Sequence, residues 1–563
     1  MQAGGPGVRT SSGSDDRLRP ASAFSPVLPA GVVSMRLLFA SALLLVSAQA
    51  ASTDLVLYNG KLWIGDAAMP SATAIAIDKG RIVAVGDDTA ILERATADSR
   101  RIDLKGHRVV PGINDAHTHV TTGLRSIDLE IDRAGGSDAV RKALAAQPQD
   151  DERWLTADIG MDVLADPAMR RRQLDALQPT RPVVLSGWTG HGALLNSAAL
   201  RAMDLSPDTV PPGGWLGRDA TGTLDGRAYE YAQWSPRTRL PSRVERLREV
   251  VSGQGATFLK LGVTSIQNMA IGTTTPDFID AWQAAATGLR VRVIRVPLAT
   301  VPGAPAPDLQ VARTDPEHPL VTVSGTKWIL DGTPMERGAA MRHAYADGSH
   351  GRLNFSRSEI EALLRESFAR GDQPLLHVSG DATLAAVLDA MQAVGSPDAW
   401  RALRPRIEHG EGLAADQVAR ARDFGIVLVQ NPAHFMLPPT ETAYMQAHAL
   451  QPLADVLKGG IALALGSDGP PNPWLNMMFA IAPVSRPDQA LSREQVLRAY
   501  TSGSAYAEFS EHEKGKLAPG YFADLAVLSQ DVLDVALPAQ ALPATASLLT
   551  VVGGEIAWRD PAF

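Results

Sequence analysis

The stretch that decides the fold runs from Val109 to Val120 and reads VVPGINDAHTHV. It begins as an apolar strand and then presents His117 and His119 with one residue between them. Side chains at positions i and i+2 of a strand point to the same side, so these two imidazoles can hold one metal ion. Asp115 is close enough to orient them. Two histidines at this spacing are also common on solvated loops, so the interpretation depends on the remaining chain.

Four later segments repeat the pattern of an apolar run that carries a residue able to bind a metal. They are GTKWILDG, PLLHVSGD, RPRIEHGE and IALALGSDGP. In a TIM barrel the carboxyl ends of the strands meet at one mouth, so distant residues of this kind can converge there. Taken singly, each could be a buried histidine or a capping aspartate. Together they predict a metal site, whose expected ligands are His117, His119, Lys327, His377, His409 and Asp468.

Strand and helix patterns alternate from about residue 111 to 507, which predicts an α/β fold with a TIM (β/α)8 barrel. The candidate strands exceed eight, so some belong to an insertion, expected around residues 188–234. The strands expected besides the first are 154–159, 182–186, 262–267, 291–297, 326–330, 374–378, 406–408, 426–430 and 461–466.

The two ends of the chain are rich in short strands and glycine turns. Residues 51–110 and 508–563 share this texture. A strand-rich segment must bury its apolar face against a partner sheet. We therefore expect the two ends to form one small β-sandwich domain.

The amino terminus carries a segment typical of export. Residues 1–34 have no apolar periodicity and are expected to be a disordered or upstream-start extension. Residues 35–50 combine Arg36, an apolar run of about a dozen residues and the Ala48-Gln49-Ala50 sequence, which is the order of a signal peptide. This predicts a protein that begins near Ala51 and works in the periplasm or outside the cell.

Composition narrows the function further. The chain has 563 residues, is 45% hydrophobic and has a formal net charge of -8, which argues against a nucleic-acid partner. It contains no cysteine, so a transition-metal site must use His, Asp, Glu or Lys. After removal of the signal segment we expect no membrane association. The expected partner is a small-molecule substrate, and a homodimer is compatible with the sequence.

Five further polar residues are candidates for substrate binding near the same mouth. His191 and Glu230 lie in the expected insertion, and a structural role is as consistent with the sequence as a functional one. Asp331, Asp381 and His434 follow strand ends. The two aspartates could equally cap a following helix.

Taken in order, PGINDAHTH, GHGALLNSAAL, GVTSIQNM, TKWILDG, HVSGD, RIEHGE, GSDGP and GKLAPGYFADLAVL resemble the metal-dependent amidohydrolase superfamily, in its branch of N-substituted formamide deformylases. The resemblance covers nearly all of the chain after residue 50. It implies a distorted TIM barrel with a small β-sandwich, and metal binding by the residues named above, often with a carboxylated lysine at Lys327. Two segments depart from the family pattern, QNPAH at 430–434 and GTPMERGAAM at 332–341, so the family's substrates are not carried over.

These observations predict a hydrolase with one or two divalent ions, Zn2+ first among them. A bound metal with an open position lowers the pKa of water to roughly 7. Asp468 is the expected proton acceptor, and His377 or His191 the group that stabilises the oxyanion. The expected reaction is hydrolysis of an amide or another non-peptide C–N bond. The alternatives are a single-metal deaminase of an aminated heterocycle and an inactive binding protein on the same scaffold.

Overall fold

The computed structural model describes residues 53–66, 68–69, 71–121, 125–240, 244–272, 274–298 and 317–563. The expected extension at 1–34 and the expected signal segment at 35–50 lie outside these residues. Within the described chain, every helix is too short or too polar to cross a membrane.

The centre of the fold is a sheet of eight strands in which every hydrogen-bonded neighbour is parallel, as the sequence predicted. This sheet is the TIM barrel. Its strands in spatial order are β8 (Ile113–Thr118), β15 (Val263–Ala270), β16 (Arg290–Arg295), β17 (Val321–Ile329), β18 (Pro374–Val378), β19 (Arg406–His409), β20 (Val427–Gln430) and β21 (Ala462–Leu465).

The barrel closes where β21 meets β8. Beyond the end of β21, the backbone N–H of Asp468 donates to the carbonyl of His117 at 2.9 Å. Gly466 permits this approach, because a Cβ at that position would lie 2.5 Å from both Cβ and N of His117. The closure therefore brings the first and the last predicted ligands together.

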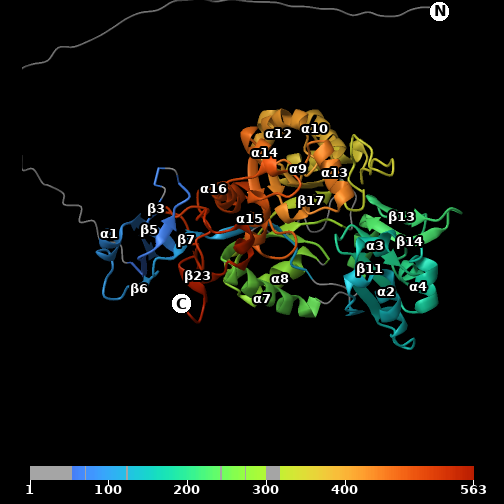
Figure 1. Ribbon diagram of the computed structural model, residues 1–563, viewed down its shortest axis with the longest axis horizontal. Helices are drawn as coiled ribbons and strands as arrows, with labels where there is room; N and C mark the ends of the chain where they lie inside the picture. The colour runs from blue at the N-terminus through green and yellow to red at the C-terminus, as the bar shows by residue number, and fades with distance from the viewer. Residues whose placement is uncertain are drawn as a thin grey trace, which may run out of the picture. The chain divides into compact units, whose positions relative to one another are not determined.

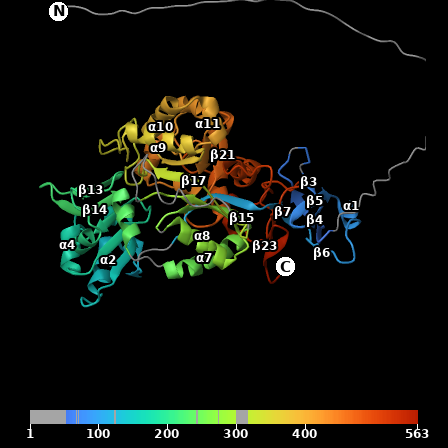
Figure 2. The ribbon, with the colours of Figure 1, turned by 180° about the vertical axis from the view of Figure 1, so that it is seen from behind.

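Helices follow the barrel strands, and their apolar faces pack on the sheet. Helix α9 (Arg357–Arg370) begins with a capping box of Ser356 and Glu359 and ends at Gly371, as the sequence predicted. Each fully buried leucine on such a face, for example Leu363, contributes roughly 1.5–3 kcal/mol. Helices α7 (Val244–Lys260) and α8 (Thr275–Ala285) lie side by side in both views (Figures 1 and 2). The other helices around the barrel are α10 (Asp381–Val394), α11 (Pro397–Leu403), α12 (Val418–Asp423), α13 (Pro439–Ala447), α14 (Ala454–Lys458), α15 (Pro473–Ile481), α16 (Arg493–Arg498) and α17 (Ser504–Ala507).

Both ends of the described chain build a two-sheet domain. Strand β7, which leads directly into β8, pairs with β22 from the far end of the chain. One apolar cluster joins the two sheets, with Leu57 and Ile75 on one side and Val109, Leu525 and Val551 on the other. The first sheet contains β1 (Leu55–Tyr58), β4 (Ala74–Asp78), β5 (Arg81–Gly86) and β6 (Arg100–Asp103); the second contains β2 (Lys61–Trp63), β3 (Ser71–Ala72), β7 (Arg108–Pro111), β22 (Leu525–Leu528), β23 (Ser547–Val552) and β24 (Glu555–Arg559).

A fourth sheet, of six strands, is built from the part of the chain between β8 and β15. It starts at Ser126, well before the range 188–234 in which the sequence suggested an insertion. The strands expected at 154–159 and 182–186 exist but belong to this sheet, because a parallel βαβ unit has the same sequence pattern in either place. The inserted sheet comprises β9 (Ser126–Asp128), β10 (Trp154–Ile159), β11 (Val183–Gly187), β12 (Gly192–Leu195), β13 (Gly214–Arg218) and β14 (Leu224–Glu230), with α2 (Gly136–Ala145), α3 (Met161–Ala165), α4 (Arg171–Leu177), α5 (Ser197–Ala202) and α6 (Tyr231–Trp234).

Candidate metal centre and active site

Three nitrogen atoms face one point at the end of β8. Nε2 of His117 lies 3.3 Å from Nε2 of His119 and 3.1 Å from Nζ of Lys327, which β17 supplies. His117 and Lys327 are almost completely buried. The structure thus brings together the H-x-H pair and the lysine, which are separated by more than two hundred residues in the sequence.

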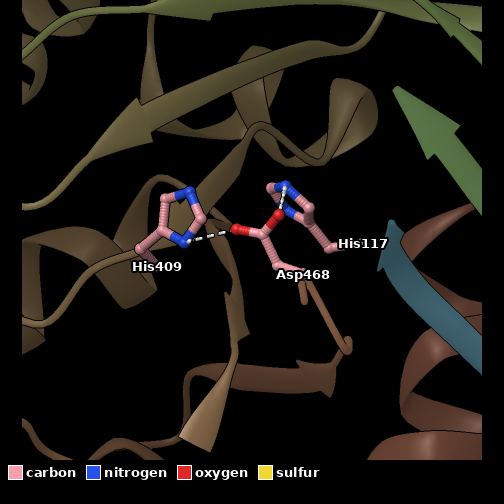
Figure 3. Close-up of side chains that lie close together, drawn as sticks. All are labelled: His117, His409 and Asp468. Atoms are coloured by element: carbon pink, nitrogen blue, oxygen red, sulfur yellow. Dashed lines mark ion pairs between the residues drawn. The ribbon is translucent and has the colours of Figure 1, made fainter. Parts of the chain in front are cut away.

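The carboxylate of Asp468 lies between the imidazoles of His117 and His409 (Figure 3). Its Oδ1 is 3.6 Å from Nε2 of both His117 and His119, and its Oδ2 is 3.7 Å from Nδ1 of His409. His117, His409 and Asp468 offer ligand atoms that all lie within 4.8 Å of one another. This spacing suits side chains arranged around a cation.

Two of these residues have strained backbone. His409 has φ 72° and Asp468 has φ 37°, in the left-handed region that non-glycine residues rarely occupy. Each such conformation costs on the order of 1–3 kcal/mol. The surrounding structure therefore holds both side chains in place at a cost in stability, which is common at functional sites.

His377 joins the cluster from the end of β18. Its ring centroid lies 4.4 Å from that of His409 and 4.7 Å from that of His191. Nε2 of His377 is 3.9 Å from Oδ1 of Asp331, the nearest carboxylate oxygen paired with it. The structure therefore places all six predicted ligands at the same end of the barrel.

Burial keeps the histidines of this cluster neutral. Desolvation, followed by nearby cationic groups, lowers the pKa of His117, His377 and His409 well below the usual value and that of His119 to about 4. Burial also lowers the pKa of Lys327. Metal ligands must be deprotonated, so this environment prepares them for a cation.

The pKa shift of Asp468 favours its charged form, unlike the pKa shifts of the histidines. Burial alone would raise the pKa of its carboxyl group, but electrostatic interactions with nearby His119, His434 and Lys327 outweigh burial and lower it. The site therefore offers one ionised carboxylate among neutral imidazoles.

A buried chain of charges orients His117, and the sequence prediction missed it. Nδ1 of His117 lies 2.6 Å from Oε2 of Glu408, and Arg406 donates to both oxygens of Glu408 at 2.7 and 2.9 Å. A carboxylate only accepts hydrogen bonds, so Nδ1 carries the proton and Nε2 keeps its lone pair for a metal. The signal was present in the alternation of Arg406 and Glu408 on β19, which points both side chains to the same face.

Two further residues orient ligands in the same way. Oδ1 of Asn431 lies 3.0 Å from Nδ1 of His409, and Oδ1 of Asp115 accepts from the backbone N–H groups of His117 and Ser467 at 3.2 and 2.9 Å. Asp115 thus ties β8 to the segment that carries Asp468. Burial raises the pKa of Asp115 to about 7.

His191 and Glu230 form a pair at the edge of the inserted sheet. Nδ1 of His191 is 3.1 Å from both oxygens of Glu230, which has φ 53°. Burial opposes protonation, but the Glu230 carboxylate outweighs it and raises the pKa of His191 to about 9. The pair reaches the cluster because the His191 ring lies against His377.

The remaining candidates for substrate binding are Asp331, Asp381 and His434, and their surroundings differ. Asp331 accepts four hydrogen bonds, from the backbone of Ser379, Gly380 and Ala340 and from the hydroxyl of Thr383. Its oxygens are occupied in holding the loop after β18, so it supports the site.

Asp381 accepts from the backbone N–H of Arg342 at 2.8 Å and supports the same region. His434 differs from both aspartates, because its Nε2 lies 2.8 Å from the carbonyl oxygen of Asp468, a metal-ligand candidate. Of the three, His434 makes the shorter polar contact with the cluster, since Asp331 lies 3.9 Å from Nε2 of His377.

Lys327 forms no ion pair among the described residues: burial lowers its pKa, and the nearby carboxylates of Asp468 and Glu408 only oppose this shift. The hydrogen-bonding neighbour of Lys327 is Nε2 of His117 at 3.1 Å. Nε2 of His117, Nε2 of His119 and Nζ of Lys327 lie so close together that these groups can carry few protons between them. A divalent cation would satisfy their lone pairs, so the residues present fit a metal.

A TIM barrel with buried histidines, a lysine and an aspartate converging at the carboxyl ends of its strands is the architecture of a metal-dependent hydrolase. The chain belongs to the amidohydrolase family, whose model matches residues 100–557. It is accordingly an enzyme that hydrolyses carbon–nitrogen bonds other than peptide bonds.

The chain is also similar to individual proteins. The chain is 27% identical over 520 residues to Protein LONG AFTER FAR-RED 3 of Arabidopsis thaliana, which covers 85% of this chain and 88% of that protein. It is 26% identical over 526 residues to the N-substituted formamide deformylase of Arthrobacter pascens, covering 86% and 94%. In fold it is similar to an uncharacterized metal-dependent hydrolase from Pyrococcus horikoshii, with TM-score 0.65, 22% identity and coverage of 85% and 98%.

Proposed function

We propose that the protein hydrolyses the amide bond of a small N-acyl or N-formyl amine, releasing a carboxylate and a substituted amine. The observation that supports the proposal is the close approach of candidate metal ligands at one end of the barrel, with Nε2 of His117 3.1 to 3.6 Å from Lys327, His119 and Asp468. The relationship to an N-substituted formamide deformylase supports the choice of bond.

The proposed metal is zinc, as one or two ions. His117, His119, His377, His409 and Asp468 would hold it, together with a carboxylated Lys327. When bound, the metal acts as a Lewis acid and lowers the pKa of water to roughly 7.

Asp468 is the proposed proton carrier. Its carboxylate accepts a proton from the attacking water while the new C–O bond forms at the carbonyl carbon. It then gives that proton to the leaving nitrogen as the C–N bond breaks. The lowered pKa of Asp468 keeps its carboxylate ionised, which a proton acceptor requires.

His191 is the proposed donor to the carbonyl oxygen. Glu230 occupies its Nδ1, so Nε2 is the ring nitrogen left to donate a hydrogen bond to developing negative charge. His377, which lies against His191, is the alternative donor. His434 and Glu230 complete the proposed substrate-binding residues, with Asp331 and Asp381 acting through the loops they hold.

The proposed setting is the periplasm or the outside of the cell, and the proposed partner is a small molecule rather than nucleic acid. These proposals rest on the sequence of residues 35–50 and on the net charge of -8.

A product assay tests the reaction. Purified zinc-loaded protein is incubated with a panel of N-formyl and N-acyl amines and, in parallel, with aminated heterocycles. We expect a carboxylate and a substituted amine from the first group. Free ammonia from a ring substrate, with no turnover of the amides, would favour the deaminase and refute the proposal.

A further inference from the structure

The inserted sheet carries a cavity of about 650 Å³. None of its described lining residues belongs to the metal cluster. It borders β9, β10 and β11, and all its described lining residues come from this sheet, its connecting segments and Arg237. In register, Thr156 pairs with Val184 and Asp158 with Ser186, so these four side chains share one face. A volume of this size is typical of sites for small ligands.

Arg237, from the short helical segment Ser235–Arg239 that follows α6, is the cation at this cavity. Its Nη2 is 3.3 Å from the hydroxyl of Ser186 and 3.5 Å from Oε1 of Gln233, both long contacts. Its buried Nε has no hydrogen-bond partner among the described residues. Burial lowers the pKa of Arg237 to about 10, and the charge of Asp158 opposes this effect.

A half-buried guanidinium with a buried, unpartnered Nε and two long contacts favours an anion as its partner. The same cavity is lined by the buried apolar side chain of Val184, and Leu129 and Ile131 also line it. A carboxylate with an aliphatic body would meet both features. Arg237 would receive the carboxylate in bidentate fashion.

The rim of the cavity is acidic. Asp128, Glu130, Asp132 and Asp158 line it and are all exposed. Arg133, the second cation of the lining, is paired with Asp158 at 3.5 Å. The rim therefore has a net negative charge, which disfavours a simple anion and favours a ligand that also carries a cationic group.

We propose that this cavity is a second small-molecule site, which binds an aliphatic zwitterion of the amino-acid class with its carboxylate on Arg237 and its ammonium group at the acidic rim. The site is independent of the proposed hydrolysis. The helix before Arg237 contacts the turn that carries His191, because Gln233 and Trp234 on this helix both donate to the carbonyl of Gly190.

Calorimetric titration of the metal-loaded protein tests the proposal with three probes of one skeleton. Leucine has both charges, 4-methylpentanoate lacks the ammonium group, and 3-methylbutylamine lacks the carboxylate. We expect saturable binding of leucine, at least about tenfold tighter than either other probe. Equal binding of 4-methylpentanoate, or no saturable binding of leucine, would overturn the proposal.

Variants locate the bound leucine. Arg237→Met should weaken leucine binding about tenfold or more while circular dichroism stays native, and Arg237→Lys should restore part of it. Arg133→Gln is the matched control, because it removes an exposed cation from the same cavity, and it should change binding less than threefold. A loss in Arg133→Gln without a loss in Arg237→Met would refute the assignment.

His119→Ala excludes the metal cluster as the binding place. Leucine should bind this variant as tightly as the unchanged protein. If binding disappears with His119, leucine binds the metal centre and the cavity proposal is wrong. Neither result depends on whether the protein hydrolyses amides.

Discussion

Replacing Glu408 with glutamine tests the buried chain that orients His117. Glu408 and Arg406 are both fully buried, and the carboxylate accepts from Arg406 at 2.7 and 2.9 Å and from His117 at 2.6 Å. The substitution keeps the shape but removes the charge that compensates Arg406. Breaking a buried pair of this kind costs about 3–5 kcal/mol.

The same change should also weaken metal binding. Without a carboxylate, the proton on Nδ1 of His117 is held less firmly, and the loss of such a partner typically reduces metal affinity about 10- to 100-fold. Two assays measure the two effects: urea denaturation of the metal-free protein, and a competition titration with a chelator. The decrease in unfolding free energy and the decrease in affinity should appear together.

Glu513→Gln serves as the control. Glu513 pairs with Arg81 at 3.4 Å, and both side chains are about half exposed, so this substitution should cost less than about 1 kcal/mol and leave metal affinity unchanged. If Glu408→Gln behaves like Glu513→Gln in both assays, the chain from Arg406 to His117 does not act as described.

Three other predictions concern the lysine, the amino terminus and pH. Lys327→Ala should lose metal and activity, and a short carboxylic acid in solution should restore part of both; two retained metals with near-normal turnover would rule out a bridging carboxylated lysine. Protein recovered from the native compartment should begin at or close to Ala51 by amino-terminal sequencing, and intact residues 1–50 on active cytoplasmic protein would contradict export. Burial and the stacked ring of His343 lower the pKa of His448 below its usual 6.5, so the unfolded chain binds more protons than the folded one just below pH 6.5, and stability should fall as pH drops through this range. Thermal midpoints between pH 7 and 5.5 should therefore fall less steeply in His448→Asn, and an unchanged slope would show that His448 contributes nothing.

The sequence predicts most of the barrel because its strands are short apolar runs that end in polar residues. The β18 range, Pro374–Val378, agrees at both ends with the expected strand. The inserted sheet could not be placed in this way. Its parallel strands β10 and β11 have the same local pattern as barrel strands, and only their pairing with β9 and β12 assigns them elsewhere.

The sequence likewise predicts some residues of the site and misses others. His117 and His119 are recognisable because one strand end carries both, and Lys327 because a lysine in an apolar strand is unusual. Glu408 escaped notice because a charged residue beside a predicted ligand gives no local sign of its partner. That partner, His117, lies 291 positions away in the sequence, so only the closed barrel makes the contact visible.

The most direct test of a metal-dependent hydrolase is the metal content of purified protein, measured by elemental analysis beside turnover of an N-acyl amine. The unchanged protein should carry one or two divalent ions per chain. His119→Ala should lose both metal and turnover while its circular dichroism stays largely native, because a barrel of this size has an extensive core. Full turnover by metal-free His119→Ala protein would contradict the metal-dependent mechanism.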